Sequence, residues 1–137
     1  MLNNKAIILI EDDQVDIMSF KRCLKELRVD NNLYIFENGN EFLGFKQNNP
    51  QIQIGIIFLD LNTPCISGLE FLAQIREDEE FRLFPIVIVS TSVEENDVKT
   101  AYIYGVKGYI NKSVDNDQYF RQIELCLKYW DSQNLMI

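Results

Sequence analysis

Four apolar runs in the sequence are each followed by polar side chains that could do chemistry together. They are Glu11, Asp12 and Asp13 after residues 5–10, Asp60 at the end of residues 55–60, Ser90 and Thr91 after residues 85–89, and Lys112 after residues 108–110. In a parallel sheet the carboxyl ends of the strands meet at one edge, where ligands bind. If these runs are parallel strands, three or four carboxylates, one or two hydroxyls and one ammonium group share that edge.

The charge of such a cluster indicates its chemistry. Carboxylates held close together repel and raise one another's pKa unless a cation intervenes. The chain has no histidine, which excludes Ser-His and Cys-His nucleophile systems, and an oxygen-rich ligand set suits a hard cation such as Mg²⁺. A carboxylate beside that cation, with a lysine and a hydroxyl in reach, can accept a phosphoryl group. Each residue alone is more often a solvated loop residue, so the prediction depends on their joint placement.

The spacing of apolar residues predicts the elements that position these groups. Continuous runs predict strands at 5–10, 33–36, 55–60, 85–89 and 108–110, and helical spacing predicts helices at 14–28, 68–78, 94–105 and 116–132. A further helix is expected after the turn at Asn38-Gly39, ending near Asn49-Pro50. In the helix at 94–105, Val98, Ala101 and Tyr102 are expected to face inward. Five alternations of strand and helix predict a three-layer α/β fold with a doubly wound, flavodoxin-like parallel sheet of order 2-1-3-4-5.

Chain length, net charge and cysteine content exclude several classes of function. A chain of 137 residues fits one domain with a sizeable core. The 21 acidic and 13 basic residues give a net charge of −8, which argues against direct nucleic-acid binding. No run is long enough to span a membrane and no secretion signal precedes the first strand, so we expect a cytoplasmic protein. Three widely spaced cysteines match no zinc or disulfide pattern.

Four segments carry a resemblance to a known family. In chain order they are I-L-I-E-D-D, F-L-D-L-N-T-P-C-I-S-G, P-I-V-I-V-S-T-S and G-Y-I-N-K. With these motifs the chain resembles the receiver domain of two-component response regulators over essentially its full length, 1–137, as a single domain of the chemotaxis type. The Glu-Asp pair, the segment before Pro85 and the aromatic C-terminal helix are also similar to the single-domain regulators that partner bacterial phytochromes.

The resemblance implies a role for each residue at the edge of the sheet. Asp60 would be the phosphoacceptor, taking the group from a phosphohistidine on a sensor histidine kinase or a phosphotransfer protein. Glu11 and Asp12 would hold Mg²⁺, or Mn²⁺, with Asp12 as a direct ligand and Glu11 bound through water. Asp60 and the backbone carbonyl of Asn62 would complete the protein ligands. Asp13 lies one place beyond the pair and is expected to cap the following helix.

The resemblance also implies how the signal leaves the site. Lys112 would contact the phosphoryl oxygens, Ser90 or alternatively Thr91 would hydrogen-bond the phosphoryl group, and Tyr109 would change rotamer. The face formed by the last two helices and the last strand would then move and bind a downstream protein target. A homodimer through this face remains open. Such a domain is not an enzyme beyond its own phosphorylation and dephosphorylation.

One departure from the family pattern concerns the residue after Lys112. The family usually has proline there, often after a cis peptide bond, whereas this chain has Ser113. A cis bond before a residue other than proline costs about 2.5–4 kcal/mol. The loop is therefore either trans or strained.

Two alternative functions remain. A pseudo-receiver would keep the fold as a binding module without phosphorylation, although intact Glu11, Asp12, Asp60 and Lys112 argue against it. A Mg²⁺-dependent phosphohydrolase acting through an aspartyl phosphate would generally need a second aspartate two residues after the nucleophile. That position is Asn62 here, and 137 residues leave little room for a substrate-selecting cap.

Overall fold

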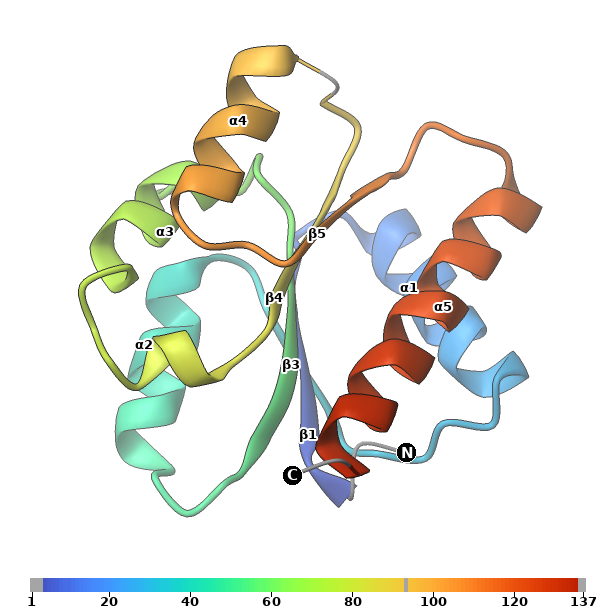
Figure 1. Ribbon diagram of the computed structural model, residues 1–137, viewed down its shortest axis with the longest axis horizontal. Coiled ribbons are helices and arrows are strands. Elements are labelled where there is room, and N and C mark those ends of the chain that lie inside the picture. The colour runs from blue at the N-terminus through green and yellow to red at the C-terminus, as the bar shows by residue number, and fades with distance from the viewer. Residues whose placement is uncertain (1–3, 93, 136–137) are drawn as a thin grey trace.

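The computed structural model describes residues 4–92 and 94–135, which form a central sheet with helices on both faces (Figure 1). The strands are β1 (Ala6–Ile10), β2 (Leu33–Phe36), β3 (Ile54–Leu59), β4 (Ile86–Ser90) and β5 (Gly108–Asn111). All neighbouring strands are parallel, and their order is β2-β1-β3-β4-β5. The predicted doubly wound, flavodoxin-like sheet is confirmed.

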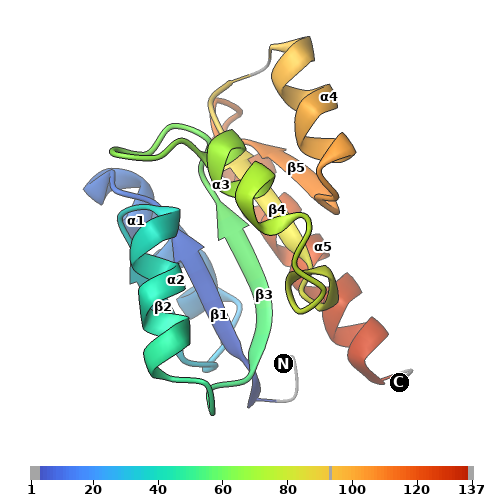
Figure 2. The same ribbon diagram turned by 90° about the vertical axis from the view of Figure 1, so that its left-hand side faces the viewer.

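The helices agree with the predicted ones to within a few residues at their ends. They are α1 (Gln14–Glu26), α2 (Gly39–Asn48), α3 (Gly68–Ile75), α4 (Glu95–Ile103) and α5 (Asn116–Leu135). Helices α2, α3 and α4 cover one face of the sheet and α1 and α5 the other (Figure 1), and Figure 2 shows α2, α3 and α4 side by side on their face. A short 3-10 helix, η2 (Phe81–Leu83), was not predicted. No helix in the described part of the chain is long and apolar enough to cross a membrane.

The side chains of the continuous apolar strands are buried on both faces of the sheet. Side chains of a strand alternate between faces, so Ile8 and Ile10 of β1 pack with α2 and α3, while Ile7 and Leu9 pack with α1 and α5. Strands β1, β3 and β4 are buried along their whole length. This double burial explains why these strands lack the polar alternation of a one-sided sheet, and it holds their carboxyl ends in fixed positions.

The prediction that Tyr102 faces inward is wrong. Ala101 of α4 is fully buried, whereas Tyr102 is 48% exposed and Ile103 is 76% exposed. Neighbouring positions on a helix point about 100° apart, and the short α4 buries a narrow stripe centred on Ala101. Tyr102 therefore contributes to the surface of the domain and not to its core.

Candidate functional site

The carboxyl ends of β1 and β3 bring three carboxylates together, as predicted. Glu11, Asp12 and Asp60 each offer an oxygen, and these three oxygens lie within 4.8 Å of one another. Glu11 and Asp60 are buried, at 3% and 7% exposure, while Asp12 is exposed. Strands β1 and β3 bring these carboxylates together because they are neighbours in the sheet and end side by side, with Ile10 opposite Leu59.

Glu11 and Asp13 are held by the turn between β1 and α1. One carboxylate oxygen of Glu11 accepts hydrogen bonds from the backbone N–H groups of Asp12, at 3.1 Å, and Asp13, at 3.3 Å. The Asp13 carboxylate accepts from the N–H groups of Val15, at 2.8 Å, and Asp16, at 3.1 Å. Asp13 is thus the N-cap of α1, which confirms its predicted separation from the acidic pair.

Lys112 reaches this cluster from the end of β5. Its ammonium group donates hydrogen bonds to Glu11 and, at 2.7 Å, to Asp16. It also lies 3.6 Å from a carboxylate oxygen of Asp60. No cis peptide bond occurs in the described residues, so the Lys112–Ser113 bond is trans. The contact with Asp16 was missed, because an acidic residue in the first turn of a helix is usually explained by the helix dipole.

The site has an excess of negative charge that fits a divalent cation. The Lys112 ammonium group lies against the carboxylates of Glu11, Asp16 and Asp60, and Asp12 adds a fourth carboxylate to the cluster. Burial raises the pKa of Glu11 to about 7, opposed by the hydrogen bond from Lys112 and reinforced by the charge of Asp60. Burial alone would lower the pKa of Lys112, but Asp16, Glu11 and Asp60 raise it to about 12. Oxygen ligands without nitrogen or sulfur suit Mg²⁺ or Mn²⁺.

The hydroxyl groups at the end of β4 differ in burial. Ser90 is fully buried, and its hydroxyl accepts a hydrogen bond from the backbone N–H of Ser92 at 3.1 Å. Thr91 is exposed. The Tyr109 hydroxyl donates to the carbonyl oxygen of Ser92 at 2.9 Å. Burial raises the pKa of this phenol, and the neighbouring Ser90 and Ser92 partly offset that rise. Tyr109 therefore ties β5 to the loop that follows Ser90.

The loop after Asp60 is fixed by its own hydrogen bonds. The backbone N–H of Asn62 donates to Asp60 at 3.3 Å, and the Thr63 hydroxyl donates to the Ile66 carbonyl at 2.6 Å. Ser67 and Glu70 form a capping box at the start of α3. At Gly68 a Cβ atom would lie 2.7 Å from the backbone oxygen of Asp60, so this glycine allows α3 to begin directly against the phosphoacceptor candidate.

Gly68→Ala is expected to lower the free energy of unfolding by about 1–3 kcal/mol, the usual cost of overpacking. The added methyl group meets backbone atoms, which cannot rotate away. Gly44→Ala is the matched control because its Cβ would have no atom within 4 Å and alanine favours the helix by up to about 1 kcal/mol. Urea denaturation of both variants measures the difference, and equal stability would contradict the close approach at Gly68.

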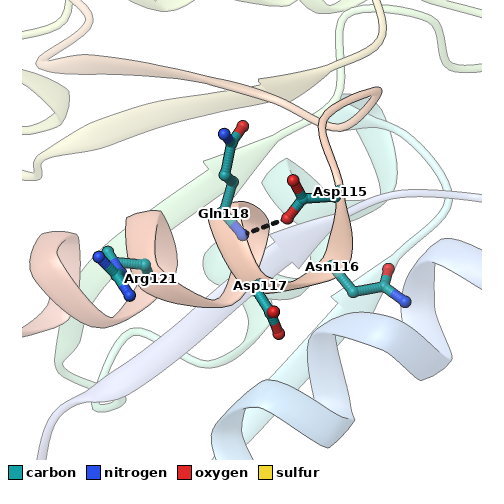
Figure 3. A pocket seen from close by; sticks show the side chains of 5 residues that line it. All are labelled: Asp115, Asn116, Asp117, Gln118 and Arg121. Atoms are coloured by element: carbon teal, nitrogen blue, oxygen red, sulfur yellow. Dashed lines mark hydrogen bonds between the residues drawn. The ribbon is translucent and has the colours of Figure 1, made fainter.

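One surface depression lies away from the acidic cluster. Its volume is about 540 Å³ and its lining comes from the start of α5 and the residue before it: Asp115, Asn116, Asp117, Gln118 and Arg121. Figure 3 shows the hydrogen bond that the Asp115 carboxylate accepts from the backbone N–H of Gln118. This bond is 2.9 Å long. None of the predicted site residues lines this depression.

Comparison with known sequences identifies relatives across nearly the whole chain. The model of the response regulator receiver domain family matches residues 7–124. The response regulator Rcp1 of Synechocystis sp. is 30% identical over 130 residues, covering 92% of this chain and 88% of its own. The probable methanogenesis regulatory protein FilR2 of Methanothrix harundinacea is 27% identical, covering 90% and 82%.

Comparison with solved structures also identifies response regulators as relatives. The phosphorylated cyanobacterial phytochrome response regulator RcpA superposes with a TM-score of 0.84 at 30% identity, over 94% of this chain and 95% of its own. The Mn²⁺-bound form of Rcp1 superposes with a TM-score of 0.80 at 30% identity, over 92% and 94%.

Proposed function

Because this chain belongs to the response regulator receiver domain family, whose general function is to accept a phosphoryl group, we propose that Asp60 is the phosphoacceptor. The observation that carries the proposal is the position of the Asp60 carboxylate. One of its oxygens accepts the Asn62 N–H, and the other lies 3.6 Å from the Lys112 ammonium. Asp60 also contributes one oxygen to the carboxylate cluster that fits a cation.

The proposed metal is Mg²⁺, held by Asp12, Asp60 and the backbone carbonyl of Asn62, with Glu11 bound through water. Receiver domains bind Mg²⁺ or Mn²⁺ at an acidic pocket, and Rcp1 has been solved in a Mn²⁺-bound form. The excess of carboxylates over ammonium groups at this rim supports the assignment. When bound, the ion neutralises charge on the carboxylate and on the phosphoryl oxygens.

In the proposed reaction an Asp60 carboxylate oxygen attacks phosphorus of a phosphohistidine. A new O–P bond forms, the N–P bond of the donor breaks, and the leaving imidazole takes up a proton. Lys112 stabilises the negative charge that spreads over the phosphoryl oxygens, and Asp16 and Glu11 hold its ammonium group at the rim. Hydrolysis of the acyl phosphate later returns Asp60 to its carboxylate, so the domain carries a signal and turns over no separate substrate.

Ser90 is proposed as the hydroxyl that hydrogen-bonds the phosphoryl group, since it is buried and Thr91 is exposed. Rotation of the Ser90 side chain toward the phosphoryl group would move the acceptor of the Ser92 N–H and so disturb the loop that Tyr109 holds. Helix α4, strand β5 and helix α5 would then present an altered face to a downstream protein, or to a second copy of this chain. Exposed Ile103, Leu125 and Tyr129 lie on these helices.

Receiver domains interact with histidine kinases, and we propose that the donor here is a kinase of the phytochrome type. RcpA and Rcp1, with 30% identity each, support this choice, because RcpA is a phytochrome response regulator. The exchange would take place in the cytoplasm, and residues 1–137 would act as a single receiver domain.

Removal of divalent metal is expected to abolish phosphorylation. Incubation with acetyl phosphate and Mg²⁺ should add the mass of one phosphoryl group to the intact protein, and the same incubation with excess EDTA should add none. Circular dichroism in EDTA serves as the control for folding. A folded protein that gains no phosphoryl mass with Mg²⁺ would favour the pseudo-receiver, whereas continuous phosphate release from unrelated monoesters would favour the phosphohydrolase.

A further inference from the structure

A groove of about 490 Å³ lies at the opposite edge of the sheet from Asp60. It is bounded by α3, η2, the start of β4 and the end of α4, on the face where Figure 2 shows α3 and α4 next to each other. Ile86, the first residue of β4, and Lys107, just before β5, line it. Because Asp60 follows the carboxyl end of β3, the groove and the phosphoacceptor site occupy opposite ends of the strands.

The walls of the groove combine apolar and polar surface in about equal parts. Phe81 and Phe84 line one side, and Ile103 and Tyr104 line the other. Ile103 is 76% exposed, and Leu83, between two lining residues, is 78% exposed. A recess of this size with exposed aliphatic side chains at its margin has the dimensions and lining of a binding site for an apolar side chain.

The rim of the groove is positively charged although the chain as a whole carries −8. Arg76, Arg82 and Lys107 line it with Glu77 as the one carboxylate, which gives a local excess of two positive charges. Arg76 stacks 4.9 Å from the Tyr104 ring centre and lies 3.6 Å from Glu77. Within the part of the chain that the structure describes, Arg82 and Lys107 have no carboxylate within 4.0 Å.

The acidic loop beside the groove does not supply those missing partners. Asp78 accepts the backbone N–H of Glu80 at 2.9 Å, and the Glu80 carboxylate forms an ion pair with Lys46. Neither residue lines the groove. Lys107 and Arg82, whose Nε donates to the Arg76 carbonyl oxygen at 3.5 Å, thus have no carboxylate partner from this loop at the edge of the groove.

We propose that this groove binds an acidic segment of a partner protein, with an aromatic or large aliphatic side chain inserted into the recess. Its carboxylates would pair with Arg82 and Lys107, and its apolar anchor would pack between Phe84 and Ile103. Charge complementarity selects an acidic partner, and a buried anchor in a pocket supplies most of the binding energy.

The probe is a short fluorescein-labelled peptide with a central tryptophan flanked by glutamate and aspartate residues. Fluorescence anisotropy with the wild-type protein should show saturable binding that weakens as salt is added. Replacing the tryptophan by alanine, or the acidic residues by lysines, should remove the binding. Lys107→Glu should raise the Kd of the peptide about fivefold or more, because it removes one exposed ion pair and adds repulsion between like charges.

Matched variants locate the binding. Lys21→Glu makes the same charge change on an exposed position of α1 and should leave the affinity unchanged. Ile103→Ser should weaken binding, whereas Leu125→Ser, at a comparably exposed position of α5 (61%), should not. Phosphoryl gain from acetyl phosphate should be the same in Lys107→Glu as in the wild type, so the result is independent of the role proposed for Asp60.

Several outcomes would overturn the proposal. These are no saturable binding up to about 1 mM, equal weakening by Lys21→Glu and Lys107→Glu, or equal weakening by Leu125→Ser and Ile103→Ser. If sedimentation shows a wild-type dimer that Lys107→Glu dissociates, the occupant is a second copy of this chain. Binding to phosphatidylserine vesicles without binding to the peptide would assign the groove to a membrane surface.

Discussion

Asp60→Asn is expected to abolish phosphoryl transfer to this protein, with a loss of at least about 10³-fold in rate, the range observed when a covalent nucleophile is removed. The amide has nearly the shape of the carboxylate but lacks the anionic oxygen that attacks phosphorus. The fold should persist, because Lys112 keeps its hydrogen bonds to Glu11 and Asp16. The gain of phosphoryl mass from acetyl phosphate and Mg²⁺ measures the effect.

Asp13→Asn is the matched control for this result. It removes the same charge from a residue close to the rim, and asparagine caps a helix about as well as aspartate, so the bonds from Val15 and Asp16 to the cap can be kept. Its phosphorylation rate should stay within about twofold of the wild type. Phosphorylation of Asp60→Asn at the wild-type rate would exclude Asp60 as the acceptor.

Lys112→Met should separate metal binding from phosphoryl transfer. The proposed ligands Asp12, Asp60 and Asn62 are unchanged and one repelling positive charge is lost, so Mg²⁺ affinity should stay equal or increase. The phosphorylation rate should fall about 10²–10³-fold, the cost of removing one group that stabilises developing negative charge. Titration of Mg²⁺ by isothermal calorimetry and the rate of phosphoryl gain at saturating Mg²⁺ measure the two effects.

The control for Lys112→Met is Lys21→Met, which removes a charge from an exposed position on α1 and should change neither quantity. Lys112 is also an ion-pair partner of buried Glu11, so thermal unfolding of Lys112→Met should be followed alongside. A variant that unfolds would be studied at a lower temperature, where it is native. A folded Lys112→Met protein that is phosphorylated at the wild-type rate would contradict a role for the lysine in transfer.

The edge of the sheet could be predicted from the sequence because strands and site residues follow from the same pattern. The continuous apolar runs before Glu11, Asp60 and Ser90 indicate strands buried on both faces. Parallel strands connected by right-handed crossovers place the following residues at one edge. The structure brings Glu11, Asp12, Asp60 and Lys112 together as that logic requires.

What the sequence did not reveal depends on packing between distant segments. Asp16 and Lys112 are 96 residues apart, and nothing in the first turn of α1 marks Asp16 as a partner for a lysine. Tyr102 has the spacing of a core residue, but α4 is too short and too peripheral to bury it. The groove with Arg82 and Lys107 joins α3, η2 and α4, and η2 itself has no helical periodicity to detect.

The most direct measurement of the central claim is chemical identification of the phosphorylated side chain. Borohydride reduces an acyl phosphate to an alcohol, so treatment of the phosphorylated protein converts the modified aspartate to homoserine, which peptide mass spectrometry can locate. The account predicts homoserine at Asp60, and none in samples treated with EDTA before acetyl phosphate. Homoserine at Asp12 or Asp13 with Asp60 unmodified would contradict it.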